Sequence, residues 1–320
     1  MTGPNPRELA RVRRSVLDWY ARAHRALPWR GSHDPYAVLV SEVMLQQTQA
    51  SQVAARYPRF IARFPGAAAL ASASEADVLA EWSGLGYNRR ALALRRAAVD
   101  VANAGWPSDL RGLQELPGVG AYTARAIGSL AFGWPVGAVD TNVRRWLVRR
   151  FDLDPESRSP AGAALQPLAD ALALAGSRPS PDEAARWTHA SMELGAVVCR
   201  ARLPTCEACP VAAGCPARGR AGRVPVAPQG PFAGSRRAYR GALLRALAAA
   251  PDHTIRRADA RTAMARFGAA GALDGTFDRH LADLAMAALE REGLAHRNGT
   301  ALRLGPPATD RKETAATIAP

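Results

Sequence analysis

LQELPGVGAYTARAIGSLAFG, residues 113–133, is the stretch that decides the expected fold. Its centre, Leu116-Pro117-Gly118-Val119-Gly120, predicts a tight turn between two helices. The two glycines let backbone N–H groups approach a ligand, and a helix N-terminus follows at once, a combination that binds phosphate without reading base sequence. Ala124 and Gly128 lie one turn apart and would allow close packing on the second helix. We therefore predict a helix-hairpin-helix.

A carboxylate interrupts the apolar run of VSEVMLQQTQ, residues 40–49. Asp34 is a preferred N-cap and Pro35 suits the first helical position, so a helix should begin at Pro35 and carry Glu42 two turns in. That helix is apolar nearly all round, which predicts burial. Burial raises the pKa of a carboxyl and makes it a general acid at neutral pH. The structural alternative is a Glu42 that reaches water, or an arginine, at the rim of the core.

A second carboxylate, Asp140, follows an apolar run in VGAVDTNVRRW, residues 136–146, and precedes a predicted helix. Aspartate is a standard N-cap, and the pattern alone favours that role. A capping carboxylate can also face a cleft, so a chemical role is compatible with the cap.

All the cysteines of the chain lie in one cluster with the spacing C-x6-C-x2-C-x5-C: Cys199, Cys206, Cys209 and Cys215. Disulfides are not expected in a cytosolic protein of this size, which leaves thiolate ligation of a metal centre. Structural zinc and an iron–sulfur cluster both accept four cysteines, and the spacing does not separate them.

Composition points to a polyanionic partner. The 320 residues carry 42 Lys+Arg against 28 Asp+Glu, a net charge of +14, which suits nucleic acid. The alternative is an arginine-rich compositional bias of the source. No apolar run is long enough to span a membrane, and the N-terminus lacks the apolar segment of a secretory signal, so we expect a cytoplasmic protein.

Two domains are expected. Residues 7–216 predict mostly helices joined by short loops and include the cysteine loop 199–215, and residues 217–235, rich in Gly, Pro and Arg, predict a linker. Residues 236–305 predict a small second domain, and we expect residues 306–320 to be a disordered tail.

The predicted second domain has helices opening at 240–244 and falling around 257–267 and 277–292, and then a hairpin. Asn298-Gly299 between two short strands is a type I′ turn signal. Three helices followed by a hairpin resemble a winged helix. Such a domain would make a second DNA contact or would serve as a packing module, and the sequence favours neither.

Together these motifs resemble the MutY adenine glycosylases, helix-hairpin-helix DNA glycosylases of base excision repair. The similarity covers about residues 10–216. It is carried, besides the cysteine spacing, by LPWR (27–30), SEVMLQQTQ (41–49), GLGY (84–87), LPGVGAYTA (116–124), VDTNVRR (139–145) and ELGAVVC (193–199).

The resemblance implies a mechanism. Glu42 would protonate a flipped-out adenine at N7, and Asp140 would stabilise the oxocarbenium ion of the sugar or add to it covalently. Tyr122 and Asn142 match positions that support the two carboxylates. Related bifunctional enzymes carry a lysine nucleophile where this chain has Tyr122, so a monofunctional glycosylase is implied.

The resemblance also assigns the remaining site residues. Family positions that contact DNA correspond to Gln47, Thr48, Tyr87, Leu116, Gly118 and Gly120. Positions around the adenine pocket correspond to Arg25, Leu27, Trp29 and Arg30. In this family the four cysteines hold one 4Fe-4S cluster, and the implied partner is double-stranded DNA with adenine opposite 8-oxoguanine or guanine. We expect a monomer.

Three features depart from the family pattern. Asn88 stands where a second tyrosine is common, and His189 stands where many relatives carry Gln or Glu near the base. A Nudix-like C-terminal domain, which helps relatives recognise 8-oxoguanine, is replaced by the winged-helix-like segment. Two alternatives therefore stay open: a mismatch thymine or uracil glycosylase of the same fold, and a non-catalytic iron–sulfur protein that binds DNA.

Overall fold

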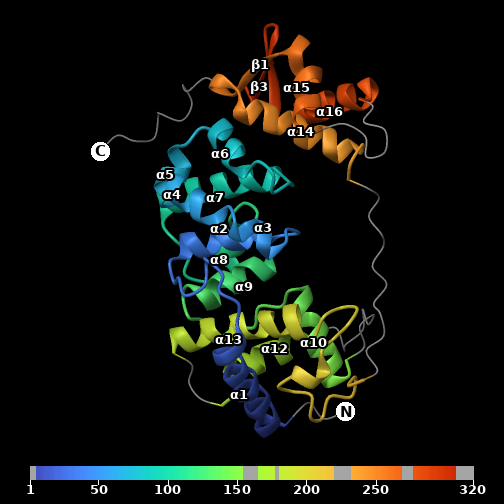
Figure 1. Ribbon diagram of the computed structural model, residues 1–320. Helices are drawn as coiled ribbons and strands as arrows, with labels where there is room; N and C mark the ends of the chain where they lie inside the picture. The colour runs from blue at the N-terminus through green and yellow to red at the C-terminus, as the bar shows by residue number, and fades with distance from the viewer. Residues whose placement is uncertain (1–4, 154–164, 177–179, 220–231, 269–276, 308–320) are drawn as a thin grey trace, which may run out of the picture. The chain divides into compact units, whose positions relative to one another are not determined.

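Helices dominate the computed structural model, which describes residues 5–153, 165–176, 180–219, 232–268 and 277–307 (Figure 1). The chain forms two compact units, Met1–Ile61 with Ala104–Ala227 and Ala62–Asn103 with Pro228–Pro320. None of the described helices combines the length and apolar composition that crossing a bilayer requires. A mostly helical fold with a small C-terminal sheet confirms the predicted fold class.

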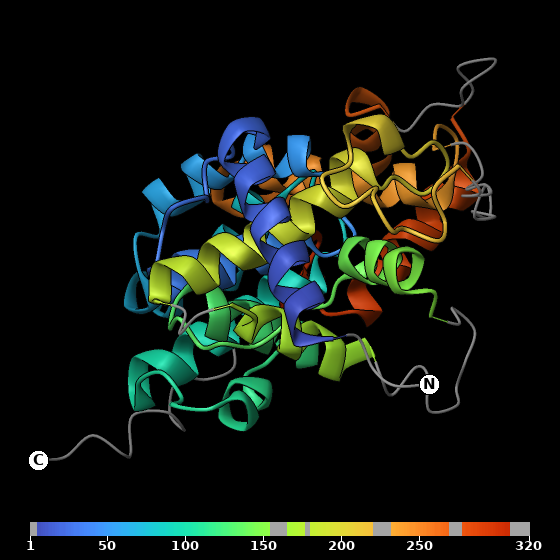
Figure 2. The same ribbon diagram turned by 90° about the horizontal axis from the view of Figure 1, so that it is seen from below.

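The first unit is built from helices that share one core. Its elements are α1 (Pro6–Ala23), α2 (Pro35–Leu45), α3 (Ala50–Ala54), α8 (Leu110–Glu115), α9 (Ala121–Leu130), α10 (Thr141–Phe151), α12 (Leu165–Leu174), α13 (Pro181–Glu193), the π-helical turn η1 (Leu194–Val198) and the 3-10 turn η2 (Cys206–Ala208). Helix α4 (Tyr57–Arg63) runs from this unit into the other. Helices α1 and α13 lie side by side in both views (Figure 1 and Figure 2), and their core includes the fully buried Val16, Leu147, Leu172 and Ala190.

Helix α2 begins as the sequence predicts. Pro35 is its first residue, and the carboxylate of Asp34 accepts hydrogen bonds from the backbone N–H groups of Tyr36 and Ala37. Residues Tyr36–Met44 are all buried, so the helix presents no solvated face and Glu42 goes inside with its apolar neighbours.

The predicted helix-hairpin-helix is formed by α8 and α9, which pack against each other. Gly118 takes φ +81°, a left-handed conformation that glycine adopts without steric cost. Gly120 caps α9 without a side chain, and a Cβ there would meet nothing within 4 Å. Gly120 and Ala121 are exposed, so the N-terminus of α9 lies at the surface.

The second unit combines α5 (Ala67–Ser72), α6 (Glu75–Trp82) and most of α7 (Arg89–Ala104) with the C-terminal residues. The latter form α14 (Arg236–Ala249), the 3-10 turns η3 (Pro251–His253) and η4 (Arg257–Asp259), β1 (Thr254–Arg256), α15 (Ala260–Arg266), α16 (Arg279–Arg291), β2 (Ala295–Asn298) and β3 (Ala301–Leu304). The antiparallel sheet has the order β1-β3-β2, so the element order is that of a winged helix.

The hairpin turn differs from the prediction by one residue. Asn298 pairs with Ala301, which makes Gly299 and Thr300 the central pair instead of Asn298 and Gly299. Gly299 has φ +60° and Thr300 is not among the residues with positive φ, so the expected type I′ turn, which needs positive φ at both centres, is wrong. Asn298 remains in the strand because its pairing with Ala301 continues the ladder.

The winged-helix-like segment packs on α6 of the same unit, through α14 and β3. The ring of His253 lies 3.5 Å from the Asp77 carboxylate, and a Cβ on Gly305 would lie 3.4 Å from the Ala76 backbone nitrogen. Residues 236–305 were expected either to make a second DNA contact or to serve as a packing module. Their contact with α6 is a packing contact. Most of the predicted linker and tail, 220–231 and 308–320, lies outside the described residues.

Gly128 makes a close contact, but its partner is the Trp134 ring, which lies outside any helix, whereas the Ala124 and Gly128 spacing predicts close helix packing. A Cβ at Gly128 would lie 2.5 Å from Cε3 of Trp134, whose ring stacks on Phe132 at 5.2 Å. We predict that Gly128→Ala lowers the free energy of unfolding by about 1–3 kcal/mol, because the ring must shift.

Gly120→Ala is the matched control, since its Cβ meets open space, and it should stay within about 0.5 kcal/mol of the parent. Urea unfolding followed by circular dichroism measures both. Equal stabilities of the two variants would contradict the packing account.

Candidate active site

Glu42 is a buried carboxyl that accepts a hydrogen bond from Tyr122. It is 4% exposed, and the Tyr122 hydroxyl donates to its Oε2 at 2.7 Å. Burial raises its pKa to about 7; the Tyr122 hydrogen bond works in the opposite direction, and the negative charge of Asp140 adds to the rise. The interpretation of Glu42 as a rim residue in contact with water is therefore wrong, because α2 is enclosed on all sides.

Tyr122 lies in the first turn of α9, directly after the hairpin. Burial and the neighbouring carboxylates Glu42 and Asp140 raise the pKa of its hydroxyl well above the ordinary value. The hydroxyl thus stays protonated and acts as a donor. The hairpin that forms the open N-terminus of α9 also supplies the hydrogen bond to Glu42.

Asp140 caps α10 and holds both oxygens in hydrogen bonds. The Val143 N–H donates to Oδ1 at 2.6 Å and the Asn142 side-chain amide donates to Oδ2 at 2.7 Å. Burial raises the pKa of Asp140, and these two donors oppose the rise. The cap and its position near Glu42 coexist, as the sequence allowed. Glu42 accepts from the Tyr122 hydroxyl and from no other donor among the described residues, so the two carboxyls have different environments.

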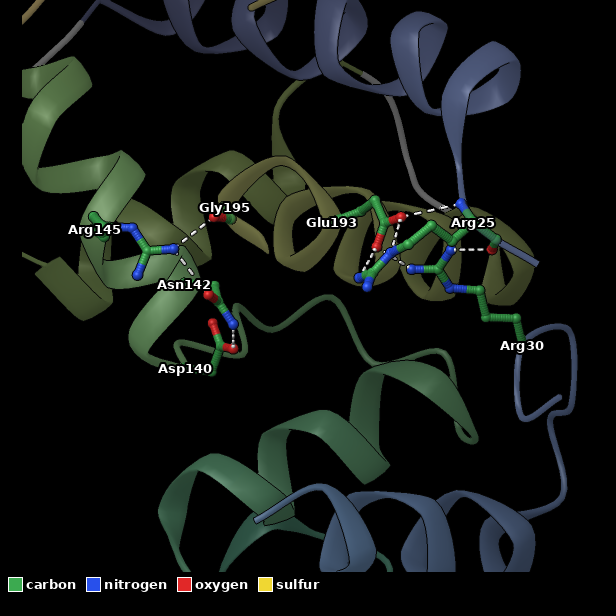
Figure 3. A network of polar contacts seen from close by, with 7 residues as sticks. All are labelled: Arg25, Arg30, Asp140, Asn142, Arg145, Glu193 and Gly195. Atoms are coloured by element: carbon green, nitrogen blue, oxygen red, sulfur yellow. Dashed lines mark hydrogen bonds and ion pairs between the residues drawn. The ribbon is translucent and has the colours of Figure 1, made fainter. Parts of the chain in front are cut away.

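Arg145 links Asn142 to the cysteine loop (Figure 3). Its Nη2 donates to Asn142 Oδ1 at 2.9 Å and to the Gly195 carbonyl at 2.5 Å, and its Nε donates to the Cys199 carbonyl at 2.6 Å. A Cβ on Gly195 would lie 2.3 Å from the Asn142 carbonyl oxygen, so only glycine lets η1 approach α10 this closely. The orientation of Asn142 therefore depends on the backbone of the cysteine loop.

Glu193 gathers two of the predicted pocket residues around one buried carboxylate (Figure 3). Arg25 donates to it from Nε at 2.8 Å and Nη2 at 2.7 Å, and Arg30 donates from Nη2 at 2.6 Å. Burial alone would raise its pKa, but the two guanidinium groups outweigh burial and lower it to about 2. Glu193 was not predicted as a site residue, although it stands directly before the apolar run of residues 194–198, a signal similar to the one that singled out Glu42.

The other residues near the predicted pocket have different surroundings. Trp29 is buried and packs edge-on against Tyr57 with ring centroids 5.9 Å apart, as a core residue would. Leu27 is partly exposed, and its carbonyl accepts from the Arg30 N–H. Burial lowers the pKa of His189 to about 3, with Arg30 adding to the effect, so this imidazole is neutral at physiological pH.

The four cysteines line one hollow, together with Arg149 and Val198. Arg149 donates to Cys199 Sγ at 3.4 Å, which places a positive charge beside the sulfur atoms. Within the described residues, no three Cys, His, Asp or Glu side chains form a group suited to a single metal ion. Thiolates gathered around one hollow are the ligand type that both structural zinc and iron–sulfur clusters use.

The predicted DNA-contacting residues are shared by the two units. Thr48, Leu116, Gly118 and Gly120 belong to the first unit, as does Gln47, whose φ is +56°. Tyr87 belongs to the second unit, has φ +47° and is 57% exposed. Left-handed backbone at a non-glycine residue is uncommon and concentrates at functional sites.

The sequence matches a known family of DNA repair proteins. A profile for the HhH-GPD superfamily base excision DNA repair protein matches residues 40–168. The adenine DNA glycosylase of Mycolicibacterium smegmatis is 41% identical over 239 residues, which cover 72% of this chain and 78% of that protein. The chain belongs to the HhH-GPD superfamily. The resemblance to the MutY adenine glycosylases is thereby confirmed.

Other relatives match over part of their length. The adenine DNA glycosylase of Mycobacterium tuberculosis is 46% identical over 203 residues, 62% of this chain and 64% of that protein. The human enzyme is 40% identical over 71% of this chain, but the match covers 43% of its own length. The matched part of this chain thus spans less than two thirds of the length of each of these two relatives.

Solved structures share the fold. A thermostable thymine-DNA glycosylase superposes with a TM-score of 0.60 and 27% identity, over 68% of this chain and 100% of that one. A trapped endonuclease III–DNA covalent intermediate superposes with a TM-score of 0.55 and 21% identity, over 68% of this chain and 98% of that one.

The Glu193 cluster generates a stability prediction with a definite pH dependence. Glu193→Gln should lower the free energy of unfolding at pH 7 by about 3 kcal/mol, because Arg25 and Arg30 lose their buried counter-charge. The folded-state pKa of Glu193, about 2, lies below the ordinary 4.5. Its contribution is therefore complete above about pH 4.5 and disappears as the pH falls toward 2.

Urea unfolding at pH 7, 5, 4 and 3 measures the difference between the two proteins. Glu292→Gln, which removes the partly exposed carboxylate that Arg240 contacts, is the control and should cost about 1 kcal/mol or less. A Glu193 effect that does not change with pH would contradict the electrostatic account.

Proposed function

We propose that this protein is a monofunctional adenine DNA glycosylase that removes adenine mispaired with 8-oxoguanine or guanine. The observation that carries the proposal is the buried Glu42 with its pKa near 7, beside an Asp140 held by two hydrogen-bond donors. Adenine is a poor leaving group until it is protonated, and Glu42 is poised to supply that proton at neutral pH.

The proposed first step moves the Glu42 proton to adenine N7. The bond between adenine N9 and the sugar C1′ then breaks, and its electron pair leaves with the base. The sugar becomes an oxocarbenium ion, which the Asp140 carboxylate stabilises by its charge or by a covalent bond at C1′. Glu42, now ionised, accepts a proton from the water that attacks C1′, and an abasic site is the product.

Tyr122 decides the reaction type in this proposal. Schiff-base chemistry needs an amine at this position of the hairpin, and a phenol cannot form one. Because burial keeps Tyr122 protonated, its role is to orient Glu42 through the 2.7 Å hydrogen bond. The strand is thus left intact after base removal.

Double-stranded DNA is the proposed substrate. The exposed N–H groups at Gly120 and the start of α9 suit a backbone phosphate. Gln47 and Tyr87 would enter the base stack as the target nucleotide flips out. Arg25, Leu27, Trp29 and Arg30, together with Glu193, would surround the base. The net charge of +14 supports the same partner.

Cys199, Cys206, Cys209 and Cys215 would hold one 4Fe-4S cluster. When bound, the cluster would tie the segment 199–215 together by four thiolate bonds and would thereby stabilise it. This chain's own residues connect that segment to the site, since Arg145 donates to the Cys199 carbonyl and to Asn142, whose amide holds Asp140.

A second candidate is a mismatch thymine glycosylase. The match to a thymine-DNA glycosylase over that protein's full length favours it. Glu42 argues against it, because pyrimidine release does not need protonation at N7. Single-turnover base release from duplexes with A opposite 8-oxoguanine, A opposite G and T opposite G separates the two. Strand cleavage at adenine that requires alkali supports the proposal, and cleavage at thymine would replace it.

Glu42→Gln tests the acid directly. We predict that adenine release falls by about 10³-fold or more, since the proton donor is lost, while binding to the duplex is kept. In the parent, the rate constant should fall about tenfold per pH unit above pH 7, because the protonated Glu42 carboxyl is the active form, and it should fall again at acid pH, where Asp140 loses its charge.

The control is Glu290→Gln, which makes the same carboxyl-to-amide change at the ion-pair partner of Arg257 and Arg297. This variant should leave the rate of adenine release and its pH profile unchanged. Unchanged base release by the Glu42 variant would refute the mechanism.

Cys206→Ser tests the cluster. The variant should lose the brown colour and its bound iron, and most DNA affinity should go with them, while much of the helical circular dichroism remains. Thr205→Ser, the adjacent substitution, should keep the colour. A colourless parent protein with one equivalent of zinc would refute the iron assignment.

A further inference from the structure

The loop before α7 displays an aromatic ring on a strained backbone. Tyr87 is 57% exposed and has φ +47°, a left-handed conformation that costs free energy for a residue with a side chain. An exposed ring on such a backbone gains little from the loop itself, so the surrounding structure must hold it in place.

Gly86, immediately before Tyr87, is fixed by two donors through its carbonyl. The indole N–H of Trp82 donates to this oxygen at 3.1 Å, and Nη2 of Arg90 donates to it at 3.2 Å. Trp82 is fully buried at the end of α6, so the loop is anchored to the core of its unit. The backbone N–H of Arg90 also donates to the Tyr87 carbonyl at 2.9 Å.

The guanidinium of Arg90 contacts two aromatic rings. Its Cζ lies 5.5 Å from the ring centroid of Trp82 and 5.4 Å from that of Tyr87. Both distances are within the range of cation–π attraction, and a planar guanidinium can lie flat on a ring as an ammonium cannot. Burial lowers the pKa of Arg90 to about 10, so the group is still charged at neutral pH.

We propose that Arg90 is a positioning residue that holds the Tyr87 ring in the orientation in which it enters the DNA base stack. The inference rests on the proposed function. Arg90 connects a buried ring, a loop carbonyl and the exposed ring, so one side chain restricts both the backbone and the side chain of Tyr87. A ring held in this way loses less conformational freedom when it inserts, which favours the flipped state of the target nucleotide.

A double-mutant cycle tests the proposal. The variants are Arg90→Met, Tyr87→Ala and the pair together, with Arg90→Lys as the conservative change. Arg96→Met, on an exposed position of the same helix, is the control for loss of charge. Three quantities are measured: the dissociation constant for the duplex, the single-turnover rate of adenine release at saturating protein, and the fluorescence of 2-aminopurine placed beside the target adenine, which reports unstacking.

We expect Arg90→Met to reduce adenine release and the 2-aminopurine signal about tenfold, and to weaken binding less than threefold. Arg90→Lys should recover only part of the loss, because it restores the charge without the planar group. In the Tyr87→Ala background, Arg90→Met should add less than a twofold further loss. Arg96→Met should leave release and unstacking unchanged.

The opposite result of the cycle overturns the proposal. If Arg90→Met causes its full loss in the Tyr87→Ala background as well, Arg90 acts through a phosphate or through the fold and not through the ring. The proposal is also overturned if Arg90→Met weakens DNA binding but leaves the rate of adenine release and the 2-aminopurine signal unchanged. Failure of the proposed function is distinct, since the parent protein itself would then release no adenine from any duplex, whether or not it releases thymine.

Discussion

The burial of Glu42 is the constraint on which the rest of the site depends. A helix that is apolar on every side carries the carboxyl into the protein, and water is replaced there by one phenol hydroxyl at 2.7 Å. The Tyr122 hydrogen bond is too weak to offset desolvation, and the charge of Asp140 adds to the effect, so the pKa of Glu42 rises to about 7. The donor comes from the first turn of α9, which the hairpin positions. The hairpin therefore holds Glu42 through Tyr122, and in the proposed function the same hairpin would bind a DNA phosphate.

Asp140 shows how the same chemical group is given a different environment. Its two oxygens accept from the Val143 N–H and the Asn142 amide, and the amide is oriented by Arg145. Arg145 in turn donates to carbonyls of Gly195 and Cys199. The aspartate is thus connected by hydrogen bonds to the segment that bears the cysteines.

The second unit assembles residues that are far apart in the chain. Helix α6 supports α14 and β3 through one part of its surface, and its last residue, Trp82, supports the loop that displays Tyr87. The winged-helix-like segment therefore belongs to the same compact body as that loop. Its contact with α6 is a packing contact, with His253 facing Asp77 and Gly305 against the Ala76 backbone.

The sequence by itself determined the start of α2, the hairpin, the cap at Asp140 and the C-terminal helices, because caps, prolines and glycines act within a few residues. It also nominated Glu42, since a lone carboxylate in an apolar run has few explanations. Only the tertiary structure decided what those groups touch. Arg25 and Arg30 meet Glu193 across more than 160 positions, and Arg145 reaches the carbonyls of Gly195 and Cys199, 50 and 54 positions away. Such contacts depend on how helices pack, which is set by the burial of whole faces and not by neighbouring residues.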